Sequence, residues 1–323
     1  MKAVGTERMP YYTKVGKDIV GCQNVAEVVS RAGLDWTVEK QPIYLEHFGA
    51  KSISYTNIVD RFATVRTDNN QVLGIVGKNY EVVQNIQGFE FIDACLGEGI
   101  EFVKAGTYNK GERVFVAAKA PEVEICGDKI IPHILFTNTH DGSGTVKAIF
   151  TPMRLVCSNG LMLPAKGHES GIITIRIPHT KSVHDRLMIA QEVITKNNKY
   201  IDALKVEAEE LLATEFSADE FIQLSKELAE VQGLEDEKVT KGQVTMIEDL
   251  QTAYNEEDIQ KFEGTAWKAI NAVADYETHK QNSRNTGNEE YQFERVAFGM
   301  ALLTTAYAII QRMVQARRRP SVQ

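Results

Sequence analysis

The segment from Asn138 to Leu161, NTHDGSGTVKAIFTPMRLVCSNGL, carries side chains of the types that perform catalysis in many enzymes. A thiol hydrolase would use Cys157 as its nucleophile, His140 as the base and Asn159 as the orienting amide. The spacing does not force these side chains together, and the sequence identifies no oxyanion hole. Asp141-Gly142 between two alternating strands is also a strong hairpin signal. We therefore predict a hairpin turn here, with Cys157 in a buried return strand.

Other catalytic sites have less support in the sequence. His133 and His140 are seven residues apart in one predicted strand, so they should face opposite sides of its sheet. There is no HExxH motif, and GKNYEVVQ at Gly77 lacks the leading glycine and the hydroxyl residue of a phosphate-binding loop. We expect no catalytic residue, no metal and no cofactor. A nuclease or thiol hydrolase built around His140, Asp141, Arg154 and Cys157 stays as the second alternative.

Basic residues recur beside aromatic ones on three predicted hairpins. A positively charged sheet face with aromatic stacking partners can hold a nucleic-acid single strand without reading its sequence. A solvated sheet face carries lysine and arginine as well, so the pattern alone leaves both interpretations open. The candidate nucleic-acid-binding residues are Arg61, Arg66, Lys78, Tyr80, Lys104, Lys110, Arg113, Lys147 and Arg154.

The spacing of apolar residues changes near residue 180, from the alternation of strands to the period of helices. Alternating apolar residues predict hairpins from RFATVRT and VLGIVG, from IEFVKAG and RVFVAAKA, and from KIIPHILFTNTH and TVKAIFT, with GIITIRI as a further strand. The segment EVVQNIQGFEFIDACLG has helical spacing and should end at Gly97. The fold class is therefore α+β: a hairpin-rich, mostly antiparallel sheet domain followed by an α-helical C-terminal half.

The C-terminal half has a helical period throughout. Apolar residues from Val183 to Leu211 follow a 4-3 alternation, which predicts one helix of about eight turns. A capping box at Ser217–Glu220 should begin the next helix, and Gly233 should end it. Further helices are predicted over 243–254, 256–279 and 289–313. The predicted organisation is an N-terminal segment (1–35), a β-rich α+β domain (36–180), an α-helical region (181–316) and a basic mobile tail (317–323).

Composition excludes several classes of protein. The chain has 323 residues, 43% hydrophobic and 25% charged, which is typical of a soluble globular protein. It has no run of about 18 apolar residues and no signal-peptide pattern, so we expect a cytoplasmic protein without a membrane partner. The four cysteines form no CxxC pair, which favours reduced thiols. Residues 1–190 hold 21 basic and 20 acidic residues, whereas residues 191–323 hold 15 and 24. The formal charge of -8 therefore lies in the helical half.

Four blocks of the sequence resemble one known family. GIVGKNYEVVQN, AGTYNKGERVFVAAK, LFTNTHDGSGTVKAIFTPMRLVCSNGL and GTAWKAINAVADYETH are similar, in this order, to the phage/plasmid-like protein family, a domain of unknown function. The resemblance implies a protein carried by bacteriophages, prophages or plasmids, acting in the host bacterial cytoplasm. Its family-motif residues are His140, Asp141, Gly142, Arg154, Cys157 and Asn159.

The resemblance and the basic hairpins together favour one function. We expect a non-enzymatic DNA-metabolism protein that binds single-stranded DNA, in annealing or recombination, as a homo-oligomer. In outline it is similar to the single-strand annealing proteins of phages, which line a basic groove with hairpins and helices. The first alternative is an anti-defence protein that binds a host protein through its acidic half.

Overall fold

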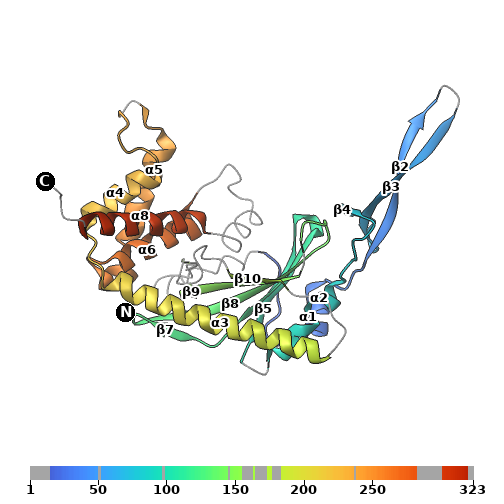
Figure 1. The fold of residues 1–323 in the computed structure, drawn as a ribbon, viewed down its shortest axis with the longest axis horizontal. Helices are drawn as coiled ribbons and strands as arrows, with labels where there is room; N and C mark the ends of the chain where they lie inside the picture. Colours follow the sequence, from blue (N-terminus) through green and yellow to red (C-terminus); the bar gives the residue numbers. More distant parts are fainter. Residues whose placement is uncertain are drawn as a thin grey trace, which may run out of the picture.

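The computed structural model describes residues 15–49, 52–96, 99–144, 146–154, 163, 173–176, 183–235, 238–281 and 300–318. Antiparallel sheets form the N-terminal half and helices form the C-terminal half, which confirms the α+β class. The molecule has the outline of a cradle (Figure 1). Its floor is the main sheet with helix α3 below it, a two-stranded ribbon rises at one end, and the remaining C-terminal helices rise at the other.

The main sheet confirms two predicted hairpins, β5–β6 and β8–β9. Its strand order is β1-β5-β6-β8-β9-β10, with β7 also paired to β8, and every pairing is antiparallel. The strands are β1 (Lys17–Asp18), β5 (Glu101–Tyr108), β6 (Arg113–Lys119), β7 (Val123–Ile125), β8 (Asp128–Thr139), β9 (Lys147–Arg154) and β10 (Ile173–Arg176). From β5 onward the order follows the chain, and short turns join β5 to β6 and β8 to β9.

The second sheet contains the remaining predicted hairpin, the one from RFATVRT and VLGIVG. It also contains a longer two-stranded ribbon that the sequence did not predict. Its strands are β2 (Val38–Phe48), β3 (Ile53–Arg66) and β4 (Val72–Gly77). Strand β4 pairs with only the last part of β3, whereas β2 follows β3 along nearly its whole length. The register shifts at Ile43, where residues 58–61 bulge and Asp60 takes a positive φ of 60°. The outer part of the ribbon therefore extends beyond the rest of the sheet.

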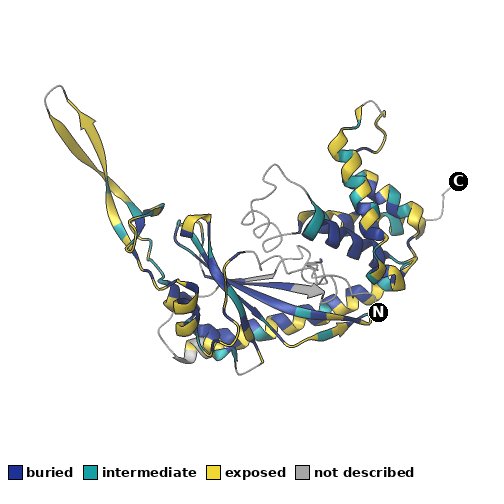
Figure 2. Ribbon diagram, turned by 180° about the vertical axis from the view of Figure 1, so that it is seen from behind, coloured by how far each residue is buried: buried dark blue, intermediate teal, exposed yellow. Residues whose placement is uncertain are grey.

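Both faces of the main sheet are largely buried, as the dark blue strands in Figure 2 show. Val116 and Phe136 lie in one core with helices α1 (Val25–Ala32), α2 (Asn85–Phe89) and η2 (Glu90–Ala94) and with the first half of α3 (Val183–Leu212). Their neighbours Phe115 and Leu135 point to the opposite face, into a core that continues into the C-terminal helices. Alternation along each strand supplies both cores, since successive side chains point to opposite faces.

The C-terminal helices confirm part of the prediction and correct the end of one helix. Helix α3 is continuous over 30 residues, and Ser217 caps α4 (Ala218–Leu228) with the predicted box to Glu220. Helix α4 ends at Leu228 rather than near Gly233, because Glu230 already takes a left-handed φ of 57°. Helix α5 (Lys241–Tyr254) lies where it was predicted.

The helix predicted over 256–279 is three elements. The 3₁₀ helix η6 (Glu257–Phe262) ends before Gly264, whose φ is +76°, and Thr265 then caps α6 (Ala266–Asp275). A π-helical turn, η7 (Tyr276–Lys280), completes the segment. Gly264 breaks the helix because a left-handed residue cannot continue it. Helix α8 (Ala301–Arg318) is the last element, and the predicted start of this helix at residue 289 lies outside the described residues.

The division into four segments stays a prediction. Strand β1, from the predicted N-terminal segment, pairs with β5 at Lys17↔Ala105. At the other end of the chain, Arg317 still belongs to α8 and pairs with Glu220 at 2.7 Å. Within the described residues, none of the helices has the length and apolar character needed to cross a membrane.

Candidate functional site

His140 lies where the second sheet meets the turns of the main sheet, a region that we call the junction. Its backbone N–H donates to the carbonyl of Glu112 (2.8 Å), and its own carbonyl accepts from the hydroxyl of Thr64 (2.7 Å). The ring Nε2 lies 2.9 Å from Oδ1 of Asn85. Because Nδ2 of Asn85 donates to the carbonyl of Leu34, its oxygen must accept, so the proton of His140 is on Nε2.

The environment of His140 makes it a structural residue rather than a base. The side chain is fully buried, and its ring meets that of Trp36 edge-on at a centroid distance of 5.3 Å. The pKa of His140 is lowered to about 4, mainly by burial; the charge of Asp141 opposes this shift and that of Arg66 adds to it. The neutral imidazole contacts Asn85 of α2 and the ring of Trp36, while the backbone of His140 bonds to Glu112 and to Thr64 of β3. Cys157 and Asn159, its partners in the hydrolase interpretation, lie outside the described residues.

The turn after His140 has the geometry that Asp141-Gly142 predicts. Oδ1 of Asp141 accepts from the backbone N–H of Ser143 (2.8 Å) and from its hydroxyl (2.6 Å), while Gly142 has a φ of +82°. The turn also touches the second sheet, since a Cβ on Gly74 would lie 2.5 Å from Cα of Asp141. The hairpin interpretation of this motif is therefore confirmed for its turn.

Two of the predicted basic residues at the junction, Lys78 and Arg66, form ion pairs with carboxylates. Lys78 pairs with Asp60 at 3.4 Å, and both side chains are exposed. Arg66 pairs with Asp68 at 2.6 Å. Its guanidinium group also lies 4.1 Å from the centre of the Trp36 ring, a cation–π contact. These contacts pair the charges of Lys78 and Arg66 at the base of the second sheet.

Arg113 and Tyr80 meet the same turn from two sides. Nε of Arg113 lies 3.8 Å from Oδ2 of Asp141. The hydroxyl of Tyr80 donates to the carbonyl of Thr139 (3.1 Å), and burial raises its pKa. The ring of Tyr80 is thus partly buried in the junction and is poorly placed to stack on a base.

The other candidates are divided between the junction and distant strands. Lys110 is exposed in the β5–β6 turn, next to Gly111, where an added Cβ would meet Arg66 at 3.0 Å. Arg61 is exposed on β3 opposite Gly77. Lys104 lies far along β5, paired with Ala117.

Arg154 lies at the opposite end of β9 from Lys147, about 23 Å away at about 3.3 Å per residue. Its side chain is outside the described residues. The structure therefore does not bring Lys104 and Arg154 to the junction.

Strand pairing adds one basic residue that the sequence did not single out. Arg176 on β10 is paired directly with Lys147 on β9, and Lys147 is paired with Thr137 on β8. Arg113 lies opposite Thr139, two residues further along β8, so it points to the same face. We call Arg113, Lys147 and Arg176 the cationic row. Within the described part of the chain, no carboxylate forms an ion pair with Lys147 or Arg176.

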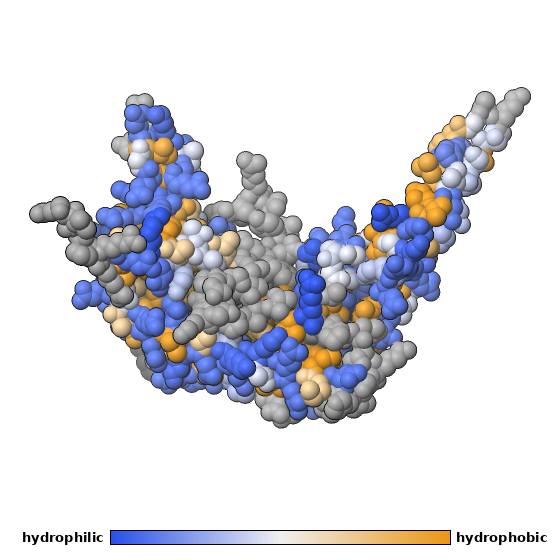
Figure 3. Space-filling model, in the orientation of Figure 1, coloured by the Kyte–Doolittle hydropathy of each residue, from blue (hydrophilic) through white to orange (hydrophobic). Residues whose placement is uncertain are grey.

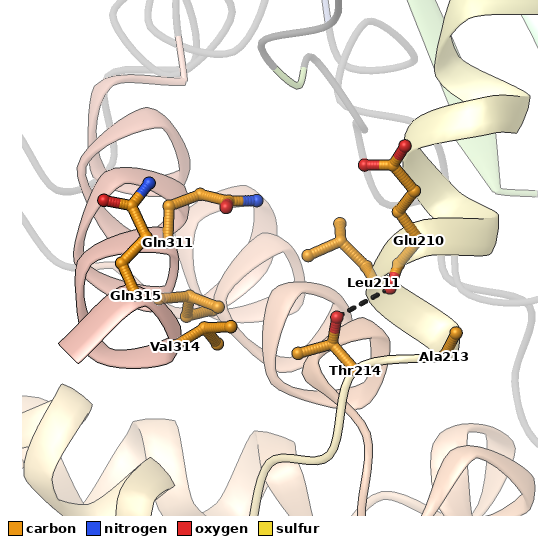
Figure 4. Close-up of a pocket in the computed structure, with 8 residues that line it drawn as sticks. Glu210, Leu211, Ala213, Thr214, Gln311, Val314 and Gln315 are labelled. Carbon is orange, nitrogen blue, oxygen red and sulfur yellow. Dashed lines mark hydrogen bonds between the residues drawn. The ribbon is translucent and has the colours of Figure 1, made fainter. Parts of the chain in front are cut away.

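A cleft between α3 and α8 is the other candidate site (Figure 4). It has a volume of about 400 Å³, and its polar side chains are Glu210, Thr214, Gln311 and Gln315. The hydroxyl of Thr214 donates to the backbone carbonyl of Glu210 at 2.7 Å. The cleft thus pairs no nucleophile with a base. No group of three or more histidine, cysteine, aspartate or glutamate side chains is placed to hold a metal ion among the residues that the structure describes.

Comparison with known proteins gives a family but no activity. The profile of a domain of unknown function, DUF932, matches residues 72–297, which include the cationic row and most of the helical half. Searches among curated proteins and among solved structures find no match. Because the matched region covers well over half of the sequence, the chain belongs to the DUF932 family.

Proposed function

We propose that this protein is a non-enzymatic DNA-metabolism protein of a phage or other mobile element that holds single-stranded DNA across the cationic row. The observation that carries the proposal is the direct pairing of Lys147 with Arg176. Like charges opposite each other in a sheet destabilise it, and no described carboxylate forms an ion pair with either side chain. Bound phosphates would offset that repulsion.

The row has the extent of a backbone-binding surface. It crosses from β6 to β10, about 14 Å at about 4.8 Å per strand, so it can contact more than one phosphate. Lysine and arginine are the usual donors to phosphate oxygens. Lys110 in the β5–β6 turn and Arg61 on β3 are both exposed and would extend the surface.

The negative charge of the helical half also favours binding of DNA at the sheet. The helical half has nine more acidic than basic residues, so a polyanion is repelled from it and confined to the sheet. Tyr80 and Tyr108 are engaged or buried, which means that recognition rests on phosphates more than on stacked bases. Binding through phosphates alone is insensitive to sequence.

The test is fluorescence anisotropy of a labelled single-stranded oligonucleotide at two salt concentrations. Each lost phosphate contact should weaken binding roughly 5-fold at about 0.1 M salt, from a slope of about -0.7 per contact. Lys147→Glu/Arg176→Glu should therefore weaken binding at least roughly 25-fold and flatten the salt dependence by about 1.4. The matched control, Lys199→Glu/Lys226→Glu, makes the same charge change on exposed helical positions and should bind as the wild type does. Equal affinities for the two variants, or no binding at either salt, would refute the proposal.

The acidic helical half supports one alternative, a protein that docks on a host protein. Its excess of nine acidic residues would then be the docking face. Capture from host lysate after nuclease treatment, together with no binding of the oligonucleotide, is the result that would favour this alternative.

A further inference from the structure

The outer part of the β2–β3 ribbon has one apolar and one polar face. Pairing of Phe48 with Ile53 and of Glu46 with Tyr55 places these side chains on one side, together with Tyr44. Between them lie the positions of Leu45, His47, Ser54 and Thr56, which point to the other side and are mostly polar. We call Tyr44, Phe48, Ile53 and Tyr55 the arm face.

Nothing in the described chain covers the arm face. The exposed fractions are 55% for Tyr44, 79% for Phe48, 55% for Ile53 and 64% for Tyr55. Strand β4 reaches only as far as Arg61, so the outer part is a ribbon of two strands. Figure 3 shows it projecting from the molecule with hydrophobic atoms on its surface. A ribbon of two strands is marginally stable in water and gains stability when a second layer covers it.

The charge of the ribbon argues against a polyanion as its partner. Residues 43–59 contain one acidic residue, Glu46, and one basic residue, Lys51, so their formal net charge is zero. Glu46 moreover accepts a hydrogen bond from the hydroxyl of Tyr55 at 3.0 Å, which places a carboxylate on the arm face itself. The arm face therefore does not extend the cationic row.

The same neutrality favours a second copy of this chain. Two copies repel one another through their helical halves, which hold the net negative charge, and the ribbon is a neutral segment where they can meet without that repulsion. With Ile58 and Val59 in the adjoining bulge, the exposed apolar area is on the order of 600 Å² for one copy, taking roughly 100 Å² per side chain. A stable dimer buries about 800 Å² per partner.

We infer that the arm face is a homodimer interface, in which the ribbons of two copies pack face to face about a twofold axis. Such an interface is self-complementary, since the same four side chains come from each copy. The aromatic rings of Tyr44, Phe48 and Tyr55 are the residue types that contribute most to protein interfaces. Dimerisation would place two cationic rows on one assembly, but the inference does not depend on what those rows bind.

The test is the mass of the full-length protein in solution, by sedimentation equilibrium up to roughly 100 µM. The wild type should be a dimer, and Phe48→Ser/Tyr55→Ser should raise the dissociation constant at least roughly 100-fold. The matched control, Val20→Ser/Val72→Ser, removes two valines that are each 58% exposed away from the arm face and should stay dimeric.

A second measurement separates loss of the interface from loss of the ribbon: maleimide crosslinking of Tyr44→Cys should join two copies, whereas Thr56→Cys on the polar face should not. A monomeric wild type, or a dimer that Phe48→Ser/Tyr55→Ser leaves intact, would overturn the inference. Oligonucleotide binding by the monomeric variant reports separately on the cationic row.

Discussion

Two buried histidines should make this protein lose stability in mild acid. His133 is 5% exposed and His140 is fully buried, and burial lowers the pKa of each to about 4. In the unfolded chain the pKa of a histidine is about 6.5. Between these two values the unfolded state binds more protons than the folded state, so the free energy of unfolding falls as the pH falls.

The magnitude follows from the two pKa values. From about pH 7.5 to about pH 5, each histidine should lower the free energy of unfolding by about 2 kcal/mol, and both together by about 4 kcal/mol. The loss should continue until the pH reaches about 4, where the folded protein itself takes up the protons. A loss of this size is a large part of the stability of a typical domain.

Urea unfolding of the wild type and of His140→Gln at the two pH values measures this effect. Glutamine can still donate a hydrogen bond to Asn85, and it does not titrate. The wild type should lose about 2 kcal/mol more than His140→Gln between the two pH values. Carboxylates are common to both proteins, so their contributions cancel in this difference. His47→Gln, a change at an exposed histidine on the ribbon, is the control and should lose as much as the wild type.

Equal losses for the wild type and His140→Gln would refute the reasoning. They would mean that His140 is hydrated in the folded protein, or that the unfolded chain keeps the histidine buried.

Three further changes test the fold. Gly74→Val should lower the free energy of unfolding by about 1–3 kcal/mol and expose the second sheet to limited proteolysis, because its Cβ would overlap Asp141. The control is Gly77→Val, whose Cβ would have nothing within 4 Å, and it should have neither effect. Trp267→Ala should cost about 3–5 kcal/mol in urea unfolding, since the ring is fully buried in α6. Ser217→Ala should cost about 1 kcal/mol by the same measurement, because it removes the acceptor for the N–H of Glu220; Ser217→Asn should restore most of the loss.

The sequence predicted those elements whose signals are local. Asp141-Gly142 and residues 68–71, between RFATVRT and VLGIVG, placed two turns, and the capping box at Ser217 placed the start of α4. Each of these signals depends on residues a few positions apart. The helix break at Gly264 was missed because an isolated glycine in a helical pattern is often tolerated, and here the bridge between Glu215 and Thr265 helps to end the helix.

The ribbon and the cationic row could not be predicted in the same way. Alternation predicts strands because one face meets a core, but the outer part of β2–β3 meets no core within the described chain. Tyr44 and Leu45 are adjacent and both exposed, so they break the expected pattern. The row exists only because β10 pairs with β9 in a register that sets Arg176 beside Lys147, and the short run Ile-Thr-Ile-Arg does not reveal its partner.

Helix α3 has a consequence for how the molecule comes apart. Its 30 residues span about 45 Å at about 1.5 Å per residue. Val193 and Tyr200 in its first half belong to one core, and Leu204 and Leu211 in its second half belong to the other. Melting the helix at either end frees apolar surface in that core and weakens the helical turns that serve the other. The sheet half and the helical half, distinct in topology, are thereby joined into a single cooperative unit.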